Sequence, residues 1–314
     1  MLLLRFIEVV LALGLVAWDI RHTPEAAVMK WGFVVFTGYS GLFGALLDVF
    51  SCREPLPGTH EAYVAARWRQ VVGSTMHCVA GDGLGILVAA AALSPLHLPR
   101  VVDLVVEYLV GFLFGWTILQ ALFMRDMAGS YRGSLRSTYL PELLSMNGVM
   151  AGMGAVSVPW KGALPDATSP LNLDFWFVMS IALCAGFLVA YPLNWWLVSK
   201  GMKHGMKTVR PDDSAPELAA GRALASATLA RAAGPGSHEG SAADDSVDAH
   251  AGQVAGTPAT EGRNAALSGH AIEYRDHQPA ASSRLELLTM IGASFALLAV
   301  GIAAAGLTGS LLGT

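Results

Sequence analysis

The sequence predicts an all-α integral membrane protein built as a bundle of about seven transmembrane helices. Hydrophobic residues make up 54% of the 314 residues and charged residues only 14%, whereas charged residues are about 25% of an average soluble domain. Long apolar runs recur along the chain, separated by short polar loops. Lys and Arg concentrate in every second loop, as they do on the cytoplasmic side of membrane proteins.

Each apolar run approaches the roughly 20 residues that a helix needs to cross a hydrocarbon core of about 30 Å. Tryptophans near many of the run ends are typical of the membrane interface. The expected spans are Leu2–Trp18, Trp31–Phe50, Val72–Leu93, Val101–Phe123, Thr138–Val158, Phe175–Val198 and Leu287–Leu307.

The first two spans differ in how well they suit a membrane. The first is short and carries Arg5 and Glu8. No small-residue cleavage site precedes Trp18, which favours a retained signal anchor over a removed signal peptide. The second span is longer, and its one acidic residue, Asp48, lies near its cytoplasmic end.

The third span carries the densest chemistry of the chain, at His77, Cys78 and Asp82. Imidazole, thiolate and carboxylate on adjacent helix faces are part of a transition-metal site, and a thiolate favours a soft ion such as Cu(I). Copper or zinc is therefore the expected cofactor or cargo. Two alternatives stay open, namely hydrogen-bonded structural groups and a proton relay.

Glycines also line the third span. Gly73, Gly81 and Gly85 share one helix face with His77, because residues four apart lie above one another. Small residues on one face let a neighbouring helix approach closely. We therefore expect these glycines to be helix-packing positions.

The fourth span begins with an acidic face formed by Asp103 and Glu107, four residues apart. Carboxylates at membrane depth are costly and are candidates for guiding cations or sharing a proton. The alternative is one interfacial acid and one acid paired with Arg100 or Lys161.

The fifth and sixth spans carry prolines. Pro141 and Glu142 open the fifth span and resemble helix-initiation residues, since proline is tolerated and acid is favoured in a first turn. Pro192 lies inside the sixth span and predicts a kink just before Asn194.

Four polar residues lie in or near the cytoplasmic halves of their spans, at a depth comparable to that of His77. If their helices are neighbours, these side chains form a polar inner vestibule. They are Asp48, Glu142, Asn147 and Asn194.

The loop between the second and third spans has two interpretations. Pro55 and Gly58 indicate a turn, and a short amphipathic helix anchored by Trp68 follows at the membrane surface. The alternative is that Cys52 and His60 join a metal site at the cytoplasmic face. The turn and the surface helix explain the segment without a metal.

Composition divides the chain into three parts. Residues 1–206 are the transmembrane domain. Residues 207–284 are rich in Ala, Gly, Ser, Asp and Pro, which predicts a disordered cytoplasmic linker. Residues 285–314 hold the last transmembrane helix.

The positive-inside rule orients the spans with the N-terminus in the cytoplasm and the C-terminus outside. The loops expected in the cytoplasm contain Arg53, Arg67, Arg69, Arg125, Arg132, Arg136, Lys200, Lys203, Lys207 and Arg210. The opposite loops contain Arg21, Lys30, Arg100 and Lys161.

Several function classes are excluded or disfavoured. A formal net charge of -4 without a basic patch excludes a nucleic-acid binder, so the expected partners are the lipid bilayer and a metal cation. Cys52, Cys78 and Cys184 form no CxxC pair, which disfavours a disulfide framework and covalent haem. The sequence has neither a P-loop nor a catalytic signature, so an enzyme is not expected.

Two motifs connect the chain to a family. HC-x-x-GD occupies His77–Asp82 and YPLNWW occupies Tyr191–Trp196. From about Thr23 to Met206 the chain resembles the bacterial membrane proteins grouped as domain of unknown function 4396. The resemblance implies a multi-pass protein of the bacterial inner membrane. Some relatives are similar to proteins linked with copper oxidases, which favours copper without naming a reaction.

Three functions remain open. The first is handling or transport of a transition-metal cation through the polar site on the third span. The second is a non-catalytic membrane scaffold or assembly factor. A membrane redox protein is least supported, because His22, His60 and His97 all lie in loops and no inward pair of histidines on separate spans is evident.

Overall fold

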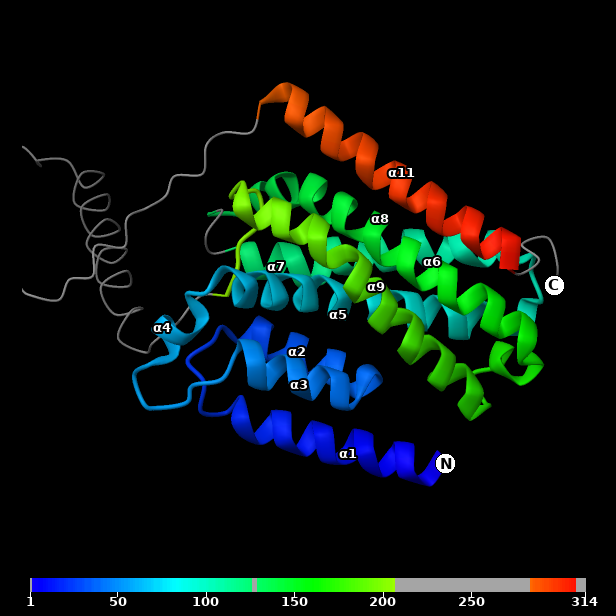
Figure 1. Cartoon of the computed structure of the whole chain (residues 1–314), viewed down its shortest axis with the longest axis horizontal. Coiled ribbons are helices and arrows are strands. Elements are labelled where there is room, and N and C mark those ends of the chain that lie inside the picture. Colours follow the sequence, from blue (N-terminus) through cyan, green and yellow to red (C-terminus); the bar gives the residue numbers. More distant parts are fainter. Residues whose placement is uncertain (1, 126–128, 207–282, 309–314) are drawn as a thin grey trace, which may run out of the picture. The chain divides into compact units, whose positions relative to one another are not determined.

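The computed structural model describes residues 2–125, 129–206 and 283–308 (Figure 1). Every regular element in these ranges is a helix, so the all-α fold class is confirmed. The predicted linker lies outside the described residues up to residue 282. The main helices are α1 (Leu2–Asp19), α2 (Ala27–Ser40), α3 (Leu42–Ser51), α4 (His60–Val64), α5 (Arg67–Leu93), α6 (Arg100–Phe114), α7 (Ala121–Met124), α8 (Tyr131–Ala163), α9 (Leu173–Ser199) and α11 (Arg284–Thr308).

Within the described ranges, four helical segments are long and apolar enough to cross a membrane. This agrees with the prediction of a membrane protein, since soluble helices seldom combine such length with such hydropathy. They are Arg67–Leu96, Arg100–Met124, Leu173–Ser199 and Arg284–Leu307.

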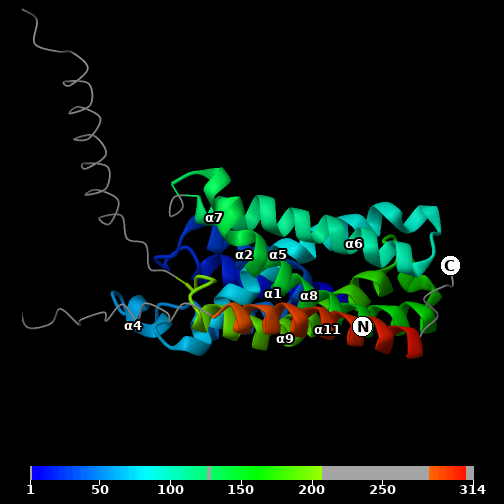
Figure 2. The ribbon, with the colours of Figure 1, turned by 90° about the horizontal axis from the view of Figure 1, so that it is seen from above.

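Helix α5 lies at the centre of the packing. It contacts α6 on one side and α9 on another, and α2 and α8 also pack against it. Figure 2 shows α6 and α9 running on two sides of α5. Helix α8 in turn packs against α9 and α11. Most side chains of α5 from Val71 to Ala90 are therefore buried.

The predicted second span is not one helix. Helix α2 ends at Ser40 and α3 begins at Leu42, and Gly41 between them has φ +63°, a conformation that favours glycine. A continuous helix of this length would separate its ends by about 37 Å at about 1.5 Å per residue. Ligand atoms of Glu25, just before α2, and Cys52, just after α3, instead lie within 4.8 Å of each other.

Helices α2 and α3 therefore form a hairpin that reverses direction at Gly41, and Figure 1 shows them side by side. They pack closely along Gly44, where an added Cβ would lie 2.7 Å from the Cα of Thr37. Hydropathy could not reveal this reversal, because both arms of the hairpin are apolar.

Helix α1 supports the turn of the hairpin. Glu8 accepts a hydrogen bond from the backbone N–H of Leu42, and Arg5 pairs with Glu8 and donates to the carbonyl of Ser40 at 3.3 Å. These backbone groups stand at a helix end, where no intrahelical partner is available. The two charges that suited the first predicted span poorly are thus used at the break between α2 and α3.

The structure also corrects the interpretation of Pro141 and Glu142. Helix α8 begins ten residues earlier, at Tyr131, and the Oγ of Ser130 caps it by accepting from the N–H of Gly133 at 3.1 Å. Pro141 and Glu142 consequently lie inside α8, so their interpretation as helix-initiation residues is wrong. Between α6 and α7, residues Gly115–Gln120 form a π-helical segment, η2.

Candidate functional site

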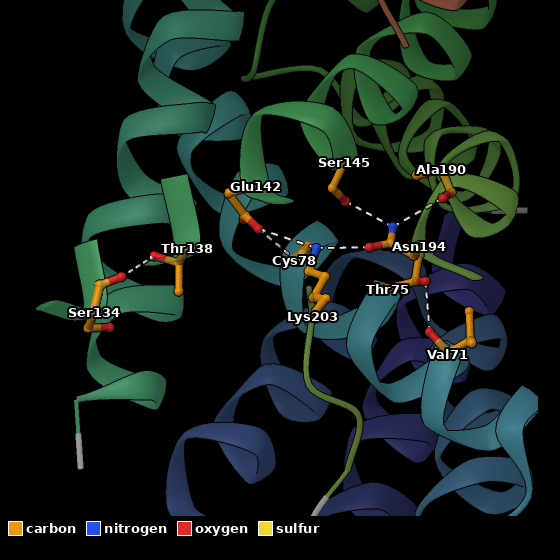
Figure 3. Close-up of polar contacts among 10 residues, drawn as sticks. All are labelled: Val71, Thr75, Cys78, Ser134, Thr138, Glu142, Ser145, Ala190, Asn194 and Lys203. Atoms are coloured by element: carbon orange, nitrogen blue, oxygen red, sulfur yellow. Dashed lines mark hydrogen bonds and ion pairs between the residues drawn. The ribbon is translucent and has the colours of Figure 1, made fainter. Parts of the chain in front are cut away.

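A buried polar network joins α5, α8 and α9 (Figure 3). The thiol of Cys78 on α5 donates to Oε2 of Glu142 on α8 at 3.0 Å. The ammonium of Lys203 lies 3.4 Å from the same oxygen and donates to Oδ1 of Asn194 at 2.8 Å. Asn194 on α9 donates in turn to Ser145 at 2.9 Å. Glu142 is therefore the group on which a thiol and an ammonium converge.

Lys203 reaches the network from the non-helical segment that follows α9. Its side chain is 1% exposed and that of Glu142 is 0% exposed, so this ion pair is shielded from solvent. Burial opposes the charged form of Lys203, but interactions with Cys78, Glu142 and Asp82 outweigh burial and raise the pKa of Lys203. Lys203 is therefore a fixed positive charge inside the bundle.

A cavity of about 410 Å³ lies next to this charge. Lys203 itself lines the cavity, together with Gln120, Thr138, Pro141 and His204. The cavity thus lies where the first part of α8 meets the segment after α9. It gives a small ion room beside the network.

Asp82 belongs to the same network. Its carboxyl group interacts electrostatically with that of Glu142 and with Lys203, while both of its oxygens are buried and lack a hydrogen-bond partner among the described residues. Gly115 of η2 makes room for Asp82, because an added Cβ there would lie 2.0 Å from Oδ1. Asp82 and Glu142 together form an acidic pair in the helix bundle.

His77 lies beside this pair without completing it. Its ring packs against Phe123 with ring centroids 5.1 Å apart, and Glu142, Lys203 and Gln120 interact with it electrostatically. Nε2 of His77 is buried and has no hydrogen-bond partner among the described residues. Nε2 of the imidazole is thus a nitrogen that could ligate a metal ion, and the ring interacts with Glu142 of the acidic pair.

The predicted glycine positions all lie at close contacts. A Cβ on Gly81 would be 2.9 Å from the Cα of Gly115, and one on Gly85 would be 2.9 Å from the Cα of Gly111. Gly73 instead accommodates Met206, whose Cγ would be 2.4 Å from an added Cβ. Gly73 therefore positions the segment that carries Lys203.

Of the four residues expected in an inner vestibule, the structure joins Glu142 and Asn194 through Lys203. Asn147 has other partners, since it accepts from Tyr108 at 2.8 Å and donates to Ser294 of α11 at 3.1 Å. Asp48 lies at the end of α3, where Asp19 and Arg53 act on it. Asn147 therefore links α8 to α6 and α11, and Asp48 lies apart from the network around Glu142.

The acidic face of α6 is occupied by a lysine. Glu107 pairs with Lys161 of α8 at 3.6 Å, and Asp103 also interacts with Lys161. This geometry matches the alternative of an acid paired with a neighbouring helix.

The predicted metal ligands do not form a compact donor set. Among the described residues, one group of His, Cys, Asp and Glu has ligand atoms all within 4.8 Å of one another, and it consists of Glu25, Cys52 and His60. His77, Cys78 and Asp82 instead surround Glu142 as separate donors. A metal ion at Glu142 would require these side chains to move together.

Sequence reasoning missed Lys203 as a site residue, because it counted this lysine only as a loop charge. A possible signal was the sequence KGMKHGM directly after α9, in which glycines separate basic residues from methionines. Gln120 and Ser145 were missed as well, since single polar residues on apolar helices carry no pattern.

Fold and network together define a helical membrane-type bundle with charged groups buried between its helices. Residues 67–203 match the model of the family described as Domain of unknown function (DUF4396), which confirms the resemblance of the sequence motifs over this stretch. The matched stretch contains Cys78, Asp82, Glu142 and Asn194 and ends at Lys203. No curated protein and no solved structure matches the chain.

Proposed function

We propose that this chain is a multi-pass protein of the bacterial inner membrane that handles or transports a transition-metal cation, copper or zinc, at the network around Glu142. The observation that carries the proposal is the contact of the Cys78 thiol with Glu142, which also holds the Lys203 ammonium. Thiolate, imidazole and carboxylate are donors that suit such ions.

The network offers a route for exchanging charges. A metal ion binds a thiolate, so Cys78 must give up its proton, and Glu142 is the hydrogen-bonded acceptor for it. The arriving cation then takes over the role of Lys203 as the counter-charge, now to the Cys78 thiolate, since Glu142 has become neutral by accepting the proton. Lys203 lies outside the helices, so it can withdraw toward the cavity without unwinding α9.

The hairpin suggests a topology different from the seven predicted spans. Six segments cross the membrane in this proposal, namely α1, α5, α6 with α7, α8, α9 and α11, while the α2–α3 hairpin enters and leaves on one side. Arg21 and Lys30 then join the positive side, which is the cytoplasmic one. Both termini consequently face outward, in contrast to the predicted cytoplasmic N-terminus.

Metal transport into proteoliposomes tests the function. Glu142→Gln and Cys78→Ser should each lower copper or zinc flux on the order of tenfold to a hundredfold, as loss of groups around a metal does. Glu107→Gln is the matched control. Glu107 is also a buried glutamate with a lysine partner, Lys161, and this pair shares no residue with the network around Glu142. Flux in both test variants equal to that of the unmodified protein would contradict the proposal.

The scaffold function remains as the second candidate. It is favoured by the direct contacts that connect three helices, which involve Cys78, Glu142, Lys203, Asn194 and Ser145. In that case the Glu142 and Cys78 variants lower thermal stability, and the unmodified protein binds no metal at Cys78 and moves none across the membrane. Co-purifying proteins would then be the measurement to pursue.

A further inference from the structure

Three side chains with metal-ligand chemistry meet at the open end of the α2–α3 hairpin. Glu25 precedes α2, Cys52 caps the end of α3, and His60 is the first residue of α4. Their ligand atoms all lie within 4.8 Å of one another, and all three residues are buried. Segments separated in the sequence thus deliver three different donors to one point.

The geometry is close to that of a zinc site. Nε2 of His60 lies 3.6 Å from Oε1 of Glu25. Two ligand atoms that are each about 2.0–2.1 Å from a tetrahedral zinc ion are about 3.4 Å apart. Three protein ligands with a fourth position for water is a known arrangement for zinc. The carboxylate makes the set less suited to Cu(I), which prefers sulfur.

The surroundings are acidic. Asp19, Glu25 and Asp48 all interact electrostatically with Cys52, and Lys30 is the positive group that acts on it. Arg53 pairs with Asp19 at 3.4 Å. The carboxylate oxygens of Asp48 are buried and accept no hydrogen bond from the described part of the chain. A cation at this point would offset the negative charge of the acids that Lys30 and Arg53 do not balance.

We propose that Glu25, Cys52 and His60 bind a zinc ion that fastens the open end of the α2–α3 hairpin. Binding forms bonds from zinc to the thiolate sulfur, the imidazole nitrogen and a carboxylate oxygen, and the thiol proton leaves to the solvent. The site lies outside residues 67–203 and shares no residue with the network around Glu142. It therefore stands independently of the proposed transport function.

Cobalt binding tests the site, because Co²⁺ replaces Zn²⁺ and a thiolate ligand gives a near-ultraviolet charge-transfer band. The detergent-purified full chain should bind about one Co²⁺ with this band, and zinc should displace it. In a Cys78→Ser background, where the network around Glu142 has no thiolate, Cys52→Ser should abolish the band, and His60→Asn should weaken cobalt binding at least on the order of tenfold. Cys78→Ser and Cys184→Ser are the matched controls and should keep the band.

The outcomes separate this site from the transport network. A band lost in Cys78→Ser and kept in Cys52→Ser would overturn the hairpin site and favour the network instead. Absence of cobalt and zinc binding in the unmodified protein would also overturn it, and would identify the three residues as a His60–Glu25 ion pair beside a thiol.

A second measurement does not depend on how the Cys52 variant folds. X-ray absorption of zinc in a Cys78→Ser, Cys184→Ser protein leaves Cys52 as the remaining cysteine. One sulfur at about 2.3 Å together with nitrogen and oxygen ligands is the expected first shell. A shell without sulfur would overturn the proposal.

Discussion

Lys203 is the residue whose removal should disturb the bundle most. Changing Lys203 to Met leaves Glu142 as a buried charge without its ammonium partner, which costs about 3–5 kcal/mol in the free energy of unfolding. The double variant Lys203→Met, Glu142→Gln removes both charges and should recover most of that loss. The free energy of unfolding of the unmodified protein, the single variant and the double variant can be measured in mixed detergent micelles.

Lys200 provides the control for this comparison. Its ion pair with Glu286 is 3.0 Å long, but both side chains are partly exposed. A solvent-screened surface pair contributes little to stability, so Lys200→Met should have a small effect. Equal losses in Lys200→Met and Lys203→Met would show that Lys203 does not compensate Glu142.

At the scale of single residues, the sequence predicted four members of the network on the helices and missed Ser145 on α8 and Lys203 beyond α9. The positions of Cys78, Asp82, Glu142 and Asn194 could be singled out because polar groups at membrane depth are costly. Their mutual contacts depend on which helices are neighbours, which spacing along one helix does not contain. Lys203 was hidden because its charge also fits the positive-inside pattern.

The α2–α3 hairpin gives a prediction at the scale of an element. Gly41→Ala places a Cβ 2.5 Å from the Glu8 carboxylate and forces φ +63° on a residue with a side chain. We expect a loss of about 1–3 kcal/mol from the backbone conformation alone, because φ +63° with ψ −129° is a region that few residues other than glycine adopt, seen as a lower midpoint of thermal unfolding.

Gly38→Ala, three residues earlier, is the matched control. It lies inside α2 with nothing within 4 Å of an added Cβ, so alanine should keep or slightly raise the stability there. A midpoint that falls equally in both variants would contradict a special role for Gly41.

Most elements could be predicted from apolar runs, and the exceptions have physical reasons. The runs predicted the positions of α1, α5, α9 and α11, and of α6 together with η2 and α7, to within about five residues. The hairpin was missed because a hydropathy profile does not show where the chain reverses. Two short apolar helices that run antiparallel have the same profile as one long helix. The start of α8 was placed too late, because its first two turns are polar.

For the whole molecule, the proposed topology can be tested with single cysteines. His22→Cys lies in the loop after α1, and Leu171→Cys lies before α9, where Leu171 is 93% exposed. Seven spans place both positions outside, whereas the hairpin topology places His22 in the cytoplasm and Leu171 outside.

A membrane-impermeant maleimide, applied to intact spheroplasts in a Cys184→Ser background, distinguishes the two arrangements. Labelling of Leu171→Cys alone is expected, and labelling of His22→Cys after lysis shows that the residue is accessible. Labelling of both positions before lysis would restore the seven-span topology.

The link between Arg5, Glu8 and the hairpin turn constrains how this protein evolves. If one of the two charges is replaced, the other is left without its partner among apolar helices. A protein with a single substitution at either position should therefore be less stable. The two positions should therefore change together across related sequences, and glycine at position 41 should change with them. We therefore expect three residues that look unrelated in the sequence, two of them in its first eight positions, to be kept or replaced together.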